Sequence, residues 1–226
     1  MKNILSVIVL IFMSTTCFAQ KVNTKILEEF SELKVYDRIT VSLKKSNENK
    51  LVITGDDKDE VSISNKNGLL KIRMEFDNFM DGDEAHATLY YNGDLTLLDV
   101  NENAKIISDE TFKADKVDIR GQEGGVINLT VDLDEVFVKA VSGSEITLTG
   151  SSKKQEISLN TGGKAYNKDL DTLDTMVTVM AGGRADVKAS EEVNAKVKAG
   201  GSIYIYGNPK SIKRDKVFGG KIKEMD

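Results

Sequence analysis

A glycine-centred tripeptide recurs at nearly constant spacing through the second half of this 226-residue chain. Its six copies are Glu123-Gly124-Gly125, Ser142-Gly143-Ser144, Thr161-Gly162-Gly163, Ala181-Gly182-Gly183, Ala199-Gly200-Gly201 and Phe218-Gly219-Gly220. The central glycines lie 19, 19, 20, 18 and 19 residues apart. A fixed period of this length is typical of a solenoid, in which each repeat forms one coil. We therefore interpret these residues as structural corners: Gly124, Gly143, Gly162, Gly182, Gly200 and Gly219.

The residues beside the corners alternate between apolar and polar. Val193, Ala195 and Val197 precede one corner, and Ile203 and Ile205 follow it. A period of two places one side of a strand in a core and the other in water. The alternative is ordinary hairpin punctuation by glycine, but hairpins rarely keep so even a spacing. The pattern predicts an all-β fold, a parallel β-solenoid with repeats of about 19 residues over residues 95–226.

Residues 20–94 lack this repeat and form a non-repeating β region, expected to cap or continue the solenoid. Alternating runs separated by Asn, Gly and Asp predict strands at residues 33–36, 39–43, 51–55, 61–64, 69–76 and 87–91. Residues 20–26 are expected to form a loose leader. Helical periodicity is absent, and only residues 170–176 are compatible with a helical turn.

Residues 1–19 have the pattern of a secretory signal peptide. Lys2 precedes an apolar run over residues 4–13, and Ala19 is a small residue at the expected cleavage point. The run is too short to span a membrane. Cys17, the single cysteine, offers the alternative of lipoprotein processing, although Ser-Thr-Thr before it is a poor lipobox. We expect an exported protein, located in the periplasm, on the outer-membrane surface or outside the cell, with a lipid anchor left open.

Few residues have side chains suited to catalysis or metal binding. Cleavage after Ala19 would leave no cysteine, which excludes a thiol nucleophile and a zinc–thiolate site. His86, the single histidine, lies in an acidic stretch expected to be a solvated loop. The same stretch holds weak calcium candidates, whose spacing does not fit an EF-hand: Asp77, Asp81, Asp83 and Glu84. A solvated acidic loop is the alternative, and we expect no metal and no cofactor.

Parallel β-helices also host polysaccharide lyases and hydrolases. A hydrolase of this kind needs paired carboxylates beside the scissile bond. The candidate carboxylates lie at different distances in sequence from the glycine corners, so they are not expected to align across coils: Asp118, Asp132, Asp134 and Asp186. The glycine pairs also lack the spacing of a phosphate-binding loop. We therefore predict no catalytic residues, and keep a carbohydrate-active enzyme as the alternative.

The composition and one pair of aromatic residues bear on partners. The formal net charge is −5 with both signs interspersed, which disfavours nucleic acid as a partner. Tyr204 and Tyr206 alternate with Ile203 and Ile205, so both tyrosines should lie on one outward face. There they would bind a sugar or a partner, or pack against a loop. Unpaired solenoid edges leave an oligomer open.

Five segments carry a family resemblance over about residues 28–223. They are F-S-E-L-K-V-Y-D-R-I-T-V-S-L from Phe30, L-V-I-T-G-D-D, N-G-L-L-K-I, G-G-S-I-Y-I-Y-G-N-P-K and F-G-G-K-I. Together they resemble the putative auto-transporter adhesin, head GIN domain family. The resemblance implies an envelope-exported bacterial protein of a kind common in Bacteroidetes. We expect an exported, non-enzymatic, adhesin-like binding or scaffolding module whose partner is a glycan or an envelope protein. An accessory or sensor protein of the envelope is a further alternative.

Overall fold

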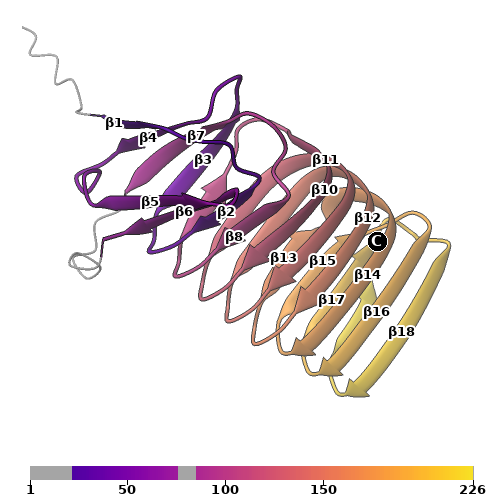
Figure 1. The fold of residues 1–226 in the computed structure, drawn as a ribbon. Coiled ribbons are helices and arrows are strands. Elements are labelled where there is room, and N and C mark those ends of the chain that lie inside the picture. Colours follow the sequence, from indigo (N-terminus) through magenta and orange to yellow (C-terminus); the bar gives the residue numbers. More distant parts are fainter. Residues whose placement is uncertain (1–21, 76–84, 226) are drawn as a thin grey trace, which may run out of the picture.

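The computed structural model describes residues 22–75 and 85–225, and the predicted all-β parallel solenoid is confirmed (Figure 1). Coils stack along one axis, and each passes through two broad faces. The strands of the first face, in spatial order, are β5 (Val61–Lys66), β6 (Leu69–Met74), β2 (Glu32–Val35), β8 (Leu97–Val100), β10 (Phe112–Gly121), the second parts of β11 (Val126–Ala140), β12 (Glu145–Leu159) and β14 (Asp169–Ala181), then β16 (Glu192–Ala199) and β18 (Ser211–Phe218).

The second face is built in the same way. Its strands are β1 (Asn23–Ile26), β4 (Lys50–Thr54), β7 (His86–Tyr91), β3 (Thr40–Lys45), β9 (Lys105–Ile107), the first parts of β11 and β12, then β13 (Lys164–Asn167), β15 (Arg184–Lys188), β17 (Ser202–Tyr206) and β19 (Lys221–Glu224). A third side, made of residues 131–135 and their counterparts in later coils, joins the two faces opposite the glycine corners. Inward side chains of the faces form one continuous hydrophobic core.

At the corners of Gly124, Gly143 and Gly162, the central glycine and the residue before it both have positive φ, and each corner is a tight turn. Glu123 and Gly124, for example, have φ of 49° and 77°, and Gly125 N donates to Gln122 O at 2.9 Å. This is a type I′ turn, which glycine adopts at no steric cost. Neighbouring corners are also bonded to each other, since Gly124 N donates to Ser142 O and Gly143 N to Thr161 O. The corner is therefore a hydrogen-bonded ladder that runs along the solenoid.

The glycine pair serves two separate steric needs. At Gly200 the backbone has a φ of 70°, but an added Cβ would meet nothing within 4 Å. At Gly163 φ is not positive, but an added Cβ would lie 2.1 Å from Ala140 O of the neighbouring coil. Ser144 at the equivalent position faces Gly121 rather than an alanine, and its Oγ donates to Gly121 O at 2.7 Å. The first glycine thus permits the turn, and the second permits the close approach of coils; in the last three corners the second glycine also has positive φ, at Gly183, Gly201 and Gly220.

Residues 22–75 join the stack out of sequence order. β2 pairs in parallel with β8 on one side and with β6 on the other. β3 likewise pairs in parallel with β9 and with β7. The corner between β2 and β3 uses Asp37 and Arg38 at positive φ, with no glycine.

One expectation for local structure was wrong. Residues 20–26 were expected to be a loose leader, but Asn23–Ile26 forms β1, which pairs antiparallel with β4 because that strand offers an open edge. Residues 170–176 do not form a helical turn. They lie in β14, where Leu170, Thr172 and Thr175 point inward and pair in register with β12.

Candidate functional site

A shallow hollow of about 510 Å³ crosses the third side of four coils. One inward column there changes from Leu133 to Ser152 and then to Thr172 in successive coils. All three side chains are buried and line the hollow. Leu173 lies on the wall with 48% of its surface exposed. We call this surface the third-side hollow.

The floor of the hollow belongs to a buried polar cluster. Thr172 Oγ1 lies 2.9 Å from Thr175 Oγ1 and donates to Lys188 O at 2.6 Å. Gln155 Nε2 donates to Thr175 Oγ1 at 2.9 Å, and Asn167 Nδ2 donates to Gln155 Oε1 at 3.2 Å. Buried polar groups are tolerated when they are paired in this way. This cluster was not predicted from the sequence, in which its signal is polar residues at inward positions of the repeat.

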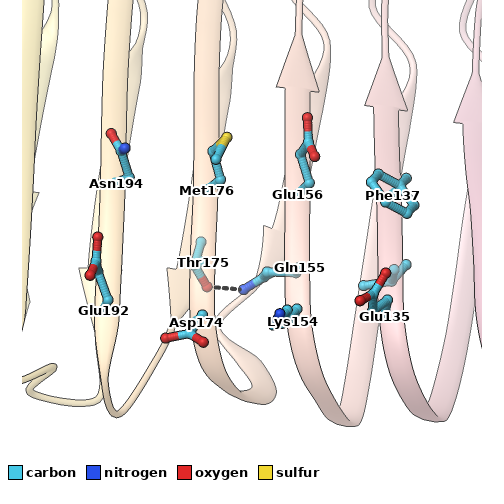
Figure 2. A pocket seen from close by; sticks show the side chains of 11 residues that line it. Glu135, Phe137, Lys154, Gln155, Glu156, Asp174, Thr175, Met176, Glu192 and Asn194 are labelled. Atoms are coloured by element: carbon cyan, nitrogen blue, oxygen red, sulfur yellow. Dashed lines mark hydrogen bonds between the residues drawn. The ribbon is translucent and has the colours of Figure 1, made fainter.

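A second hollow, of about 410 Å³, lies beside it on the first face (Figure 2). Figure 2 shows one row of Phe137, Glu156, Met176 and Asn194 and a second row of Glu135, Lys154, Asp174 and Glu192. Gln155 and Thr175 form the floor between the two rows. The two hollows therefore share one polar layer beneath them.

The structure separates the carboxylates considered for catalysis. Asp118 lies on the first face and Asp186 on the second, whereas Asp132 and Asp134 both line the third-side hollow. Each of the four pairs with a basic side chain: Asp118 with Arg120, Asp132 with Lys113, Asp134 with Lys153 and Asp186 with Arg184.

The hydrogen bond and the positive charge of Lys113 hold the pKa of Asp132 below its usual range. A glycosidase general acid needs a raised pKa, so Asp132 is unsuited to that role. The pKa of Lys153 is raised by its hydrogen bond to Asp134 and by the charge of that carboxylate. The carboxylates of this hollow therefore belong to ion pairs that link neighbouring coils.

Tyr204 and Tyr206 lie on one outward face of β17, and Ile203 and Ile205 point into the core. Two basic side chains lie against the ring of Tyr204. Arg184 and Lys221 lie over its ring, at 4.7 and 5.4 Å from the centroid. The two cations come from β15 and β19, the strands on either side of β17.

Of the remaining candidates, the structure describes His86 but not the four weak calcium candidates. Asp77, Asp81, Asp83 and Glu84 lie outside the described residues. His86 was expected in a loop, but it is the first residue of β7, exposed and paired with Thr40 and Thr54. Within residues 22–75 and 85–225, no group of three or more His, Cys, Asp or Glu side chains is placed to hold a metal ion. The described part of the chain contains no helix that is long and apolar enough to cross a membrane.

The sequence matches the family model described as putative auto-transporter adhesin, head GIN domain, over residues 29–209. The chain belongs to this family. The match ends before β18 and β19, so the final coil lies beyond the family model. No curated protein matches the sequence.

Solved structures share the fold of this adhesin-like module. A putative adhesin from Bacteroides fragilis is 17% identical with a TM-score of 0.81, covering 91% of this chain and 96% of its own. A putative adhesin from Parabacteroides distasonis is 18% identical with a TM-score of 0.75, covering 92% and 98%. A protein from the same organism titled putative lipid binding protein is 15% identical with a TM-score of 0.70, covering 91% and 96%. At these identities the likeness concerns the fold alone.

Proposed function

We propose that this adhesin-like module is exported to the cell envelope and binds an external glycan or envelope protein without catalysis. The observation that carries the proposal is the third-side hollow. It is open and shallow, extends over several coils, and has a floor of hydrogen-bonded polar side chains. Its acidic side chains form ion pairs with lysines of neighbouring coils, as Asp171 does with Lys188 at 2.7 Å. Such a surface suits contact with an extended ligand more than enclosure of a reacting bond.

Export is part of this proposal. The pattern of residues 1–19 supports it, and so does membership of a family described as auto-transporter adhesins. A direct check is the N-terminal sequence of the protein recovered from the envelope fraction of the native bacterium. Cleavage after Ala19 is the expected result. A lipid-modified Cys17 at the N-terminus would show instead that the protein is anchored.

Binding is tested with a glycan array, followed by product analysis on every glycan that binds. We expect retention of at least one glycan without cleavage. The double variant Leu173→Asp with Lys153→Ala should weaken that binding about tenfold, because it changes the wall and one rim charge of the hollow. Lys139→Ala, on the first face, should leave it unchanged.

The enzyme alternative has its own outcome. Cleavage of a bound glycan that is lost in Asp132→Asn or Asp134→Asn would show a carbohydrate-active enzyme and overturn the proposal. Binding that is unaffected by the double variant would place the ligand elsewhere on the molecule.

A further inference from the structure

A row of basic and aromatic side chains crosses the second face of the C-terminal coils. We call it the basic ladder, and it consists of Lys164, Tyr166, Arg184, Tyr204, Lys221 and Lys223. Strand register places Lys164, Arg184, Ser202 and Lys221 in one column, and Tyr166, Asp186 and Tyr204 in the next. The Arg184 guanidinium lies 5.7 Å from the centroid of Tyr166 and 4.7 Å from that of Tyr204. Cations and rings therefore alternate along the solenoid axis.

Arg184 is held in place before any ligand arrives. Its Nε and Nη2 donate to the two carboxylate oxygens of Asp186, each at 2.9 Å. The Asp186 side chain is only 5% exposed, whereas that of Arg184 is 48% exposed. The bridge does not use Nη1. Two aromatic neighbours and a bidentate bridge reduce the entropy that this long side chain would lose on binding.

The charge of this face is opposite to that of the whole chain. Outward positions of β13, β15, β17 and β19 carry one acidic residue, Asp186, and five basic ones: Lys164, Arg184, Lys188, Lys221 and Lys223. Lys188 and Lys164 also have carboxylate neighbours, Asp171 at 2.7 Å and Glu145 at 3.5 Å. Lys221 and Lys223 are exposed on the last coil. A cationic surface on a chain of net charge −5 indicates an anionic partner.

We propose that the basic ladder binds an acidic polysaccharide lying along the solenoid axis. Adjacent strands are about 4.8 Å apart, so Lys164 and Lys221, three strands apart, are separated by about 14 Å. That length matches several carboxylated sugar units rather than a single anion. Hydroxyl groups of Tyr166 and Tyr204 are available for hydrogen bonds to sugar hydroxyls.

A bilayer fits this face less well than a polysaccharide does. Proteins that lie on membranes bury aliphatic or large aromatic side chains in the interface. The outward positions of β13, β15, β17 and β19 hold Lys, Arg, Tyr, Asp and Ser, with no Leu, Ile, Val, Phe or Trp among them. The inference goes beyond the proposed function, because it concerns a different face and is unaffected by variants of Leu173 and Lys153.

The experiment measures binding of the full chain to polygalacturonate by isothermal titration calorimetry at low and high ionic strength. The triple variant Lys164→Ala, Lys221→Ala, Lys223→Ala should weaken binding about tenfold or more, because it removes three of the positive charges that attract the anionic polysaccharide. A matched control removes equal charge from the first face: Lys139→Ala, Lys196→Ala and Lys198→Ala. Arg184→Lys keeps the charge opposite Asp186 but loses the planar fork, so an intermediate loss is expected.

The results separate the possible partners. Loss of binding in the ladder triple variant alone, with weaker binding at high salt, supports the inference. Equal loss in both triple variants, equal binding of neutral dextran, or no binding of polygalacturonate would each overturn it. Binding to phosphatidylglycerol vesicles without binding to polygalacturonate would indicate a membrane instead. If the triple variant fails to fold, the exposed single change Lys223→Glu must weaken binding for the inference to stand.

Discussion

Arg214 and Glu224 form an ion pair across the last coil, at positions where the preceding coil places Ala195 and Ile205 in the core. Lys216 occupies a third such position, in register with Val197. The last coil therefore places three charged side chains at inward positions, beside Ile212 and Ile222, which pack against the core. Inward-pointing charges at an open edge discourage pairing with another chain, because association would bury them.

Removing these charges should make the end of the solenoid adhesive. The triple variant Arg214→Val, Lys216→Val, Glu224→Val would extend the apolar column to the open edges of β18 and β19. We expect association that increases with protein concentration, measured by light scattering after size-exclusion chromatography. The variant Lys213→Val with Asp215→Val adds apolar surface at outward positions of the same strand and should associate less. An unchanged mass for the triple variant would contradict the protective role of these charges.

The two glycine positions of a corner should respond differently to substitution. Gly200→Val places a β-branched residue at positive φ and should cost about 1–3 kcal/mol of unfolding free energy. Gly200→Asn should cost less than about 1 kcal/mol, because asparagine tolerates this conformation. Gly163→Ala brings a methyl group against Ala140 O and should cost about 3 kcal/mol or more.

Chemical denaturation of the four proteins, including wild type, measures these differences. If Gly200→Val and Gly200→Asn were equally stable, φ would not be the limiting property at this corner. If Gly163→Ala were as stable as the wild type, the coils would have room to separate, contrary to the contact distance.

Glu102 should make stability depend on pH. A hydrogen bond with Asp37, burial and the negative charges of Asp37 and Glu123 raise the pKa of Glu102 from 4.5 to about 7, and Arg73 opposes the shift. The folded state therefore holds this proton more tightly than the unfolded state. The resulting contribution is complete below pH 4.5 and is lost as pH rises through about 7. Thermal melting should show lower stability at pH 8 than at about pH 5.

The variant Glu102→Gln isolates this effect. It keeps a hydrogen-bonding side chain but removes the titration, so the decline in melting temperature between these pH values should become smaller. Glu123→Gln, at an exposed position of the next corner, is the control and should change the slope less. An identical slope in Glu102→Gln and the wild type would assign the pH dependence to other groups.

The buried polar cluster should be sensitive to the loss of one member. Asn167 Oδ1 accepts from Leu148 N at 3.1 Å, and its Nδ2 donates to Gln155. Asn167→Ala removes the hydrogen-bond partner of the Leu148 N–H and of Gln155 Oε1, both buried, and should cost about 1–3 kcal/mol of unfolding free energy. Thr149→Val, which removes an exposed hydroxyl contact with Thr130, should cost about 0.5 kcal/mol or less. Urea denaturation compares the two, and equal small losses would show that the cluster contributes little.

The sequence predicted the C-terminal coils well because they carry two redundant signals. Glycine spacing marks each corner, and alternation marks each arm, as at Val193 and Ile203. The corner of Asp37 and Arg38 could not be found in this way, since two non-glycine residues adopt positive φ there. Local sequence also does not reveal that β2 lies between β6 and β8, because that order depends on pairing between distant residues.

The candidate surfaces were harder to predict than the fold. The third-side hollow is lined by Ser152 and Thr172, which alternation alone does not distinguish from other inward positions. Tyr204 was placed correctly on an outward face, but its contact with Arg184 depends on strand register between coils. That register can be predicted only if the 18-residue interval between Gly182 and Gly200 is used to pair each residue of β15 with the residue 18 positions later in β17.

The out-of-order position of β2 and β3 has a consequence for how the chain assembles. In the later coils each strand pairs with a segment about one repeat away, such as Ile127 with Ile146. β2 instead pairs Leu33 with Leu98, and β3 pairs Val41 with Ile106. Closing these longer loops costs more entropy, so such contacts form late unless neighbouring structure already exists. β2 and β3 can pair with β6 and β7 as these are synthesised, but their pairing is complete only once β8 and β9 have joined the stack.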